Sequence, residues 1–243
     1  MKMQKFVTHF ALLIILGLIS TTSYGCRNFP EPRGQENPVK EERNIANFTK
    51  LDIGGAFEVI LSQGDQVKLV VEAEADELKD IKTEVNGSTL KIYTESTWNP
   101  RYHEMRIYLT ITKLESVDFS GAVEVRSAGT LSFTDLELNV SGATEIELNL
   151  TANKLDAEFS GASEIDLTGK ATSGRFELSG ASDFDAENLE FQDLSVEVSG
   201  ASDAKVWATG TLNIDASGAS TIRYKGNPRI SLDESGASSV KPL

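Results

Sequence analysis

The sequence predicts an all-β fold: a right-handed parallel β-helix, or solenoid, with about 18–21 residues per coil, preceded by a β-rich N-terminal segment. Three observations predict this fold. The tripeptide Ser-Gly-Ala recurs seven times at nearly constant spacing, apolar and polar residues alternate between the copies, and no stretch keeps a helical period. A fixed period of this length indicates stacked repeat units rather than an ordinary globular core.

The repeat defines a corner in each coil. Its copies begin at Ser120, Ser141, Ser160, Ser179, Ser199, Ser217 and Ser235, and a diverged copy, Gly54-Gly55-Ala56, lies upstream. Glycine permits the positive φ angle that a sharp corner requires. We expect the serine hydroxyls to hydrogen-bond to one another along the stack and the alanines to point inward. Coils should stack at the strand spacing of about 4.8 Å, with the hand that crossover connections favour.

Two apolar columns predict the core. One contains the residue before each serine, and the other contains the third residue after each alanine. The apolar members are Phe119, Val140, Phe159, Leu178, Val198 and Ala216 in the first column, and Val125, Ile146, Ile165, Phe184, Ala204, Ile222 and Val240 in the second. Because polar residues alternate with them, these side chains should face inward.

The chain divides into four predicted segments. Residues 1–25 are a signal peptide, residues 26–47 a proline-containing tether, residues 48–112 an N-terminal β region with the first repeat-like coil, and residues 113–243 the repeat solenoid. Within the β region, Asn86-Gly87 predicts a turn between two strands. The signal peptide follows from Lys2 and Lys5, the apolar run over residues 10–19, and the small and polar residues after it.

Cys26, the only cysteine, comes directly after the predicted signal peptide. It resembles the lipidation site of a bacterial lipoprotein, although Ser23 stands where that motif prefers leucine. Cleavage after Gly25 by an ordinary signal peptidase is the alternative. We expect an exported protein of the cell envelope, an outer-membrane lipoprotein on the surface or the periplasmic side.

The charge balance excludes some partners. The net charge is −14, and removal of residues 1–25, with their two lysines, takes it to −16. Nucleic acid and anionic lipid surfaces bind through Lys and Arg clusters, so we expect neither as a partner. A contact with the membrane is expected through the lipid anchor alone.

The first coil resembles a known family. Residues 48–59, Phe-Thr-Lys-Leu-Asp-Ile-Gly-Gly-Ala-Phe-Glu-Val, are similar to the opening motif of the "putative auto-transporter adhesin, head GIN domain" family. The later Ser-Gly-Ala-Ser-Glu-Ile-Asp-Leu repeats extend the resemblance over residues 48–240. It implies a secreted, often lipid-anchored β-helical protein of the Bacteroidetes type, and it supplies no catalytic residues.

A column of carboxylates is the first candidate site. The second residue after each alanine is Glu124, Glu145, Glu164, Asp183 and Asp203, with Glu58 upstream. Stacked carboxylates repel one another, and Ca²⁺ could bridge them through oxygen ligands. Solvated surface residues are the favoured alternative, because the tight Gly/Asp spacing of calcium-binding repeats is missing. We therefore expect no metal and no cofactor.

Two further outward columns are polar. One mixes charges, which indicates pairing between coils, and the other lies two residues before each serine. Their members are Arg126, Glu147, Asp166, Asp185, Lys205 and Arg223 in the first, and Asp118, Asn139, Glu158, Glu177, Glu197, Asp215 and Asp233 in the second.

An aromatic loop is the second candidate site. Trp98, Arg101 and Tyr102 flank Pro100, a composition typical of surfaces that stack on sugars or contact proteins. The alternative is that these aromatic side chains cover the end of the solenoid. Trp207, near a corner, is expected to fill the core or a groove.

Catalysis finds little support in the sequence. His103 is the only histidine after the predicted signal peptide, and no spacing places a base beside a repeated serine. We expect a non-enzymatic, adhesin-like module that binds a surface glycan or a protein. The alternatives are a polysaccharide lyase or hydrolase on a β-helix scaffold, and a structural envelope protein that forms a homo-oligomer through uncovered strand edges.

Overall fold

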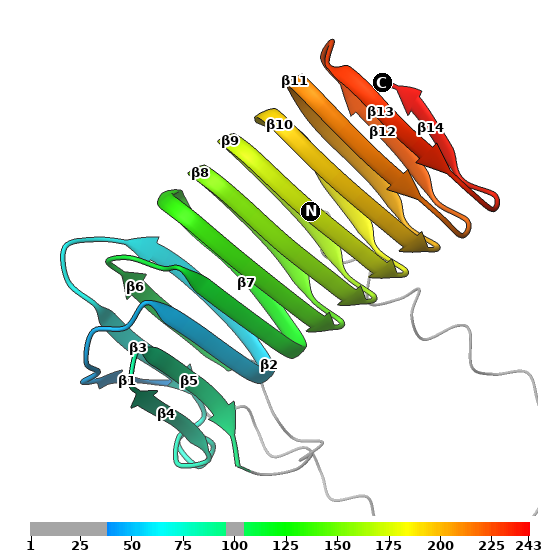
Figure 1. Ribbon diagram of the computed structural model, residues 1–243. Coiled ribbons are helices and arrows are strands. Elements are labelled where there is room, and N and C mark those ends of the chain that lie inside the picture. The colour runs from blue at the N-terminus through cyan, green and yellow to red at the C-terminus, as the bar shows by residue number, and fades with distance from the viewer. Residues whose placement is uncertain (1–37, 96–104) are drawn as a thin grey trace, which may run out of the picture. The chain divides into compact units, whose positions relative to one another are not determined.

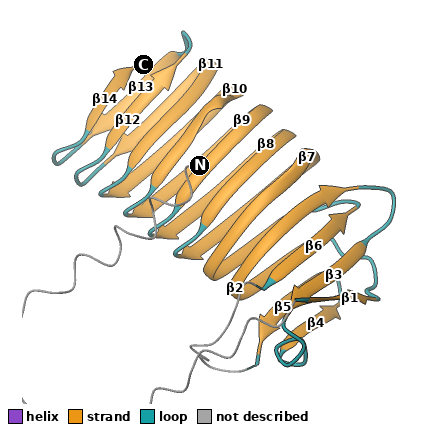
Figure 2. Cartoon of the chain, turned by 180° about the vertical axis from the view of Figure 1, so that it is seen from behind, coloured by secondary structure: helices purple, strands orange, loops and turns teal. Residues whose placement is uncertain are grey.

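The structure, a computed structural model, describes residues 38–95 and 105–243, which belong to one compact unit, Glu36–Leu243. This unit is a right-handed β-solenoid of about six turns with a β-rich N-terminal segment (Figures 1 and 2). The predicted fold class is confirmed. Seven corners enclose six complete coils between them. The described ranges contain no helix that is long and apolar enough to cross a membrane.

Fourteen strands join into one sheet that wraps around the core. The N-terminal strands are β1 (Val39–Arg43), β2 (Lys50–Gln63), β3 (Lys68–Ala73), β4 (Ile81–Asn86), β5 (Thr89–Thr94) and β6 (Arg106–Ile111). The repeat strands are β7 (Ser116–Gly142), β8 (Glu145–Gly161), β9 (Glu164–Gly180), β10 (Asp183–Gly200), β11 (Asp203–Ala216), β12 (Thr221–Lys225), β13 (Arg229–Glu234) and β14 (Ser239–Pro242).

Each coil has two faces that meet at the Ser-Gly-Ala corner. We call the strand segments that lead into a corner the pre-corner face and those that follow it the post-corner face. In the coil of β8, residues 145–150 lie on the post-corner face and residues 155–161 on the pre-corner face, and both pair in parallel with β7 and β9. The long strands therefore bend from one face to the other while the chain climbs the stack.

The N-terminal end of the solenoid is closed by additional strands. β2 forms the first coil and pairs with β7 on one side; on its other side it pairs with β5 through residues 50–54 and with β6 through residues 58–63. Antiparallel strands extend this end, because β4 pairs with β5, and β3 pairs with both β6 and β1. The predicted turn after Asn86 is confirmed as the hairpin between β4 and β5.

Each corner consists of glycine stacked on glycine. Gly142 and Gly161 have φ angles of 110° and 114°, and the other repeat glycines also have positive φ. A Cβ atom on Gly161 would lie 2.3 Å from the carbonyl oxygen of Gly142, which accepts a hydrogen bond from the backbone of Ala162 at 2.9 Å. The corner therefore requires glycine for its conformation and also for the space between coils.

Two expectations about the corner are wrong. The serine hydroxyls donate to backbone carbonyls of the preceding coil rather than to one another: Ser160 Oγ lies 3.3 Å from the oxygen of Val140, and Ser179 Oγ lies 3.3 Å from that of Phe159. The alanines are exposed, as Ala162 illustrates, and the residue after each alanine is the one that points inward. Alternation from the buried Phe159 to the buried Ile165 already places Ser163 inward and Ala162 outward, so the small size of alanine was a misleading guide.

The residues that follow the alanines form a buried column of hydroxyl side chains in five of the coils. Its members are Thr144, Ser163, Ser182, Ser202 and Ser220, which are between 1% and 5% exposed. Ser202 Oγ accepts a hydrogen bond at 3.2 Å from the backbone N–H of Ser182, which the bend at the corner takes out of the ladder. The Ser202 hydroxyl, one coil further along, thus accepts a hydrogen bond from a backbone N–H that would otherwise be buried without a partner.

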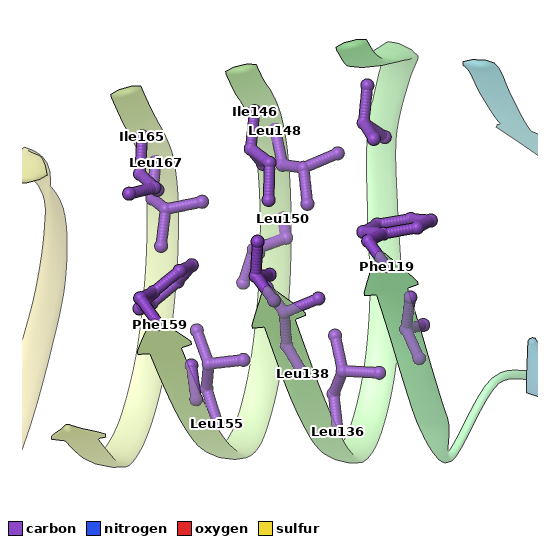
Figure 3. Packing of buried hydrophobic residues seen from close by; sticks show 14 of the residues in the cluster. Phe119, Leu136, Leu138, Ile146, Leu148, Leu150, Leu155, Phe159, Ile165 and Leu167 are labelled. Atoms are coloured by element: carbon purple, nitrogen blue, oxygen red, sulfur yellow. The ribbon is translucent and has the colours of Figure 1, made fainter. Parts of the chain in front are cut away.

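The two predicted apolar columns form the core, except for the partly exposed Val240. Figure 3 shows Phe119, Ile146 and Phe159 projecting between the two faces of the stack. In the next coils the phenylalanine rings touch: the centroids of Phe176 and Phe184 are 4.8 Å apart. Equivalent positions in successive coils fill the interior with apolar side chains, so each coil buries those of its neighbours.

Candidate functional site

The outward side chains of the post-corner face form two straight columns, which together we call the charged face. Strand register places members of each column beside one another on neighbouring strands. The first column is Glu58, Glu124, Glu145, Glu164, Asp183, Asp203, Thr221 and Ser239, and the second is Arg126, Glu147, Asp166, Asp185, Lys205, Arg223 and Lys241. The carboxylate column expected from the sequence is therefore a physical column on one surface.

Arginines neutralise the N-terminal part of the charged face. Arg106 of β6 pairs with Glu58. Arg126 forms an ion pair with Glu124 of its own strand. Its Nη2 atom also lies 3.5 Å from Oε1 of Glu145 in the next coil. These contacts confirm the expected charge pairing between coils.

The middle of the charged face is acidic. Burial of the carboxyl group, followed by repulsion from Glu145 and Asp183, raises the pKa of Glu164. Burial and the neighbouring Asp185 raise the pKa of Asp166 in the same way. Like charges on adjacent strands destabilise a sheet, so this region carries an electrostatic cost.

The acidic centre does not gather into a metal site. Within residues 38–95 and 105–243, no group of three or more His, Cys, Asp or Glu side chains is arranged to hold a metal ion. A column places its carboxylates in a line along the surface, whereas Ca²⁺ takes six to eight oxygen ligands around one point.

The C-terminal part of the charged face is basic. Lys205 pairs with Asp185 at 2.6 Å and stands in register with Arg223, which is in register with Lys241. Lys225 Nζ lies 4.1 Å from the ring centroid of Trp207, a cation–π contact. Lys241 is the fourth residue after Ala237, the offset that Lys205 and Arg223 share, and the register of the last coil places it beside Arg223.

Trp207 does not fill the core, which was one of the two places expected for it. It is partly exposed, and it lies between two buried residues, Val206 and Ala208, so that its indole points outward. The alternation of Val206 and Ala208 was the signal in the sequence that could have indicated this orientation.

The pre-corner face carries two shallow polar hollows. One, of about 160 Å³, is lined by residues that include Asn139, Asp156 and Arg175. The other, of about 350 Å³, is lined by residues that include Ser141 and Ser160 of the repeat. Small-molecule sites are usually enclosed and mostly apolar, so these hollows are better suited to surface contact than to enclosing a ligand.

Four predicted site residues lie outside the described ranges. They are Cys26, the expected lipidation site, and Trp98, Arg101 and Tyr102 of the aromatic segment. The segment that contains the last three connects β5 to β6, and Arg106 at the start of β6 pairs with Glu58 at the first position of the charged face.

Comparison with known proteins identifies the family. The model of the family described as "Putative auto-transporter adhesin, head GIN domain" matches residues 47–228. The chain belongs to this family. The resemblance carried by the first coil and the repeats is thus confirmed, and the matched region contains the closed N-terminal end and most coils of the solenoid.

Solved structures share the fold of this family member. A putative adhesin from Bacteroides fragilis has a TM-score of 0.78 at 21% identity, over 86% of this chain and 98% of its own. A putative lipid binding protein from Parabacteroides distasonis has a TM-score of 0.68 at 22% identity, over 85% and 97%. A putative adhesin from Parabacteroides merdae has a TM-score of 0.66 at 15% identity, over 85% of this chain and 96% of its own. No curated protein matches the chain.

The raised pKa of Glu164 predicts how pH affects stability. A carboxyl whose pKa is raised by folding contributes stability below its ordinary value of 4.5, and this contribution is lost as pH rises through the folded value. Glu164→Gln should therefore stabilise the protein at pH 7 by about 0.2–1 kcal/mol, the usual size of cross-strand contacts. The gain should disappear as the pH falls below 4.5, as urea unfolding at each pH can measure.

Asp65→Asn is the matched control, because it removes an exposed carboxylate from the bend between β2 and β3, away from the stacked column. It should leave the stability at pH 7 nearly unchanged. Equal effects of the two variants would mean that net charge, and not the local column, sets the cost.

Proposed function

We propose that the protein is a non-enzymatic, adhesin-like module that binds an extended surface glycan or a protein. The observation that supports this most is the display of outward columns in fixed register over about six turns, in a member of an adhesin-type family. Such a surface offers repeated, evenly spaced contacts to a long ligand. The shallow hollows of the pre-corner face suit the same mode of binding.

The family and its structural neighbours support a role other than catalysis. The family is described as an auto-transporter adhesin, and two of the neighbours are described as adhesins. An adhesin-type family is one of secreted or cell-surface proteins. A polysaccharide lyase or hydrolase on the same scaffold is the alternative that the binding experiment below must separate.

Attachment to the outer membrane through lipidated Cys26 is part of the proposal. The support is the apolar run over residues 10–19 and the position of the single cysteine after Gly25. In cells that express the full chain, Cys26→Ser should move the protein from the membrane fraction to the soluble fraction. An unchanged membrane fraction, with no lipid adduct in the mass of the mature protein, would contradict lipid anchoring.

The aromatic segment is the proposed ligand contact. Trp98 and Tyr102 offer rings that can stack on a sugar, and Arg101 offers hydrogen-bond donors. The segment leads directly into β6 and so to the first position of the charged face, where Arg106 meets Glu58. Stacking on the aromatic residues and polar contacts along the charged face would then act on one ligand.

A glycan array and a panel of envelope proteins test this function. The protein should bind a subset of ligands, and Trp98→Ala should weaken that binding about 30-fold, the loss expected of an aromatic hot spot of about 2 kcal/mol. Asp65→Asn is the control, since Asp65 is exposed on the bend between β2 and β3 and belongs to neither column of the charged face, and it should change affinity little.

Two results would contradict the proposal. The first is equal loss of binding in the Trp98 and Asp65 variants. The second is the appearance of new reducing ends or unsaturated products when the protein is incubated with polysaccharides, which would identify an enzyme.

A further inference from the structure

The coil formed by β13 and β14 exposes apolar side chains that belong to the core columns. Ile230 and Leu232 stand in register with the buried Leu212 and Ile214, yet they are 43% and 45% exposed. β13 pairs with β11 and β14 pairs with β12, and within the described ranges no strand pairs with their other edges. Uncovered strand edges and core positions together favour association with another chain.

The opposite end of the solenoid is not open in this way. The outer edge of β2 is occupied by β5 and β6, and the antiparallel strands β1 and β4 lie beyond them. β1 has the sequence Val-Lys-Glu-Glu-Arg, so this edge presents four charged residues and one apolar side chain, whereas β13 presents Ile230 and Leu232. Stacking of one copy's C-terminal coil on another copy's N-terminal end would therefore be unfavourable.

The two strands at the open end carry opposite charges on their outward sides. On the post-corner face, Lys241 of β14 continues the cationic row of Lys205 and Arg223. Among the described residues, Arg223 and Lys241 take part in no ion pair. On the pre-corner face, Asp233 of β13 is in register with Asp215.

Asp215 is in turn in register with Glu197 of β10, so the pre-corner face ends in an anionic row. Each row places like charges on adjacent strands, which destabilises an isolated chain. A partner that presents anions to the cationic row and cations to the anionic row would relieve both costs.

A second copy of the same chain meets this requirement. β13 and β14 run in opposite directions on the two faces, because the chain reverses at the Ser235-Gly236-Ala237 corner. A two-fold rotation about an axis parallel to the strands exchanges the faces. It would bring β13 of one copy beside β14 of the other, in antiparallel pairing.

We infer that the protein forms a two-fold homodimer through β13 and β14. The pre-corner face of each copy is then continued by the post-corner face of the other. Lys241 of one copy then lies opposite or diagonal to Asp233 of the other, within reach of its long side chain. Ile230, Leu232 and Val240 of both copies extend the apolar columns across the interface, beside Glu234, which stands in register with the buried Ala216. The dimer would carry two copies of the proposed ligand contact and so increase avidity.

Charge exchange tests this dimer. The experiment uses the full-length export form with Cys26→Ser, which removes the lipid anchor and any disulfide between copies. Sedimentation velocity from micromolar to millimolar concentration should show a monomer–dimer equilibrium that weakens with added salt. Lys241→Glu and Asp233→Lys should each raise the dissociation constant at least tenfold, and the double variant should restore it to within a few fold.

The single variants should not weaken the monomer. A carboxylate at position 241 would lie beside Arg223, and an amine at position 233 would lie beside Asp215, so each change improves the charge contacts within its own chain. Melting temperatures equal to or above that of the parent separate loss of the interface from loss of folding. Lys113→Glu, a surface lysine near the other end, is the matched control and should not change the dissociation constant.

Three results would overturn the inference. One is a monomer at every concentration. Another is a dimer that both single variants retain or that the double variant fails to restore. The third is growth beyond the dimer, because open-ended polymers would require the two different ends to join.

Discussion

The close approach of glycine backbones at the corner is the constraint on which the rest of the structure depends. Each repeat glycine has positive φ, and its carbonyl accepts a hydrogen bond from the next coil, as Gly142 does from Ala162. A side chain at this position would occupy the space of the preceding carbonyl. The corner therefore fixes the height and the register of each coil on the one before it.

Fixed register has consequences inside and outside the solenoid. Inside, it stacks apolar positions into columns and places Ser202 where its hydroxyl serves the backbone of Ser182. Outside, it stacks charges, so that Glu164 lies between Glu145 and Asp183, and burial together with repulsion from these neighbours raises the pKa of its carboxyl group. The same geometry that makes the stack rigid makes its surface a regular array, and the proposed binding and self-association both use that array.

The sequence was sufficient for the coil, its core and the carboxylate column, because these follow from a period that repeats seven times. The expectation for Ala162 was wrong because it rested on the small size of alanine, whereas alternation between Phe159 and Ile165 places Ser163 inward and Ala162 outward, as observed. The N-terminal β region was predicted, but the way its strands close the end of the solenoid was not. β5 and β6 pair with β2 from distant positions in the chain, and no local pattern encodes such contacts. Trp98, Arg101 and Tyr102 remain a prediction from composition.

The most direct test of the corner constraint compares two glycines with the same conformation and different surroundings. Gly161 has φ of 114° and a Cβ would meet Gly142 at 2.3 Å, whereas Gly129 has φ of 104° and nothing within 4 Å. Urea unfolding should show that Gly129→Ala costs about 1 kcal/mol, the conformational penalty alone, and that Gly161→Ala costs more than about 3 kcal/mol. Equal losses would show that contact between coils at the corner does not control the stability of the stack.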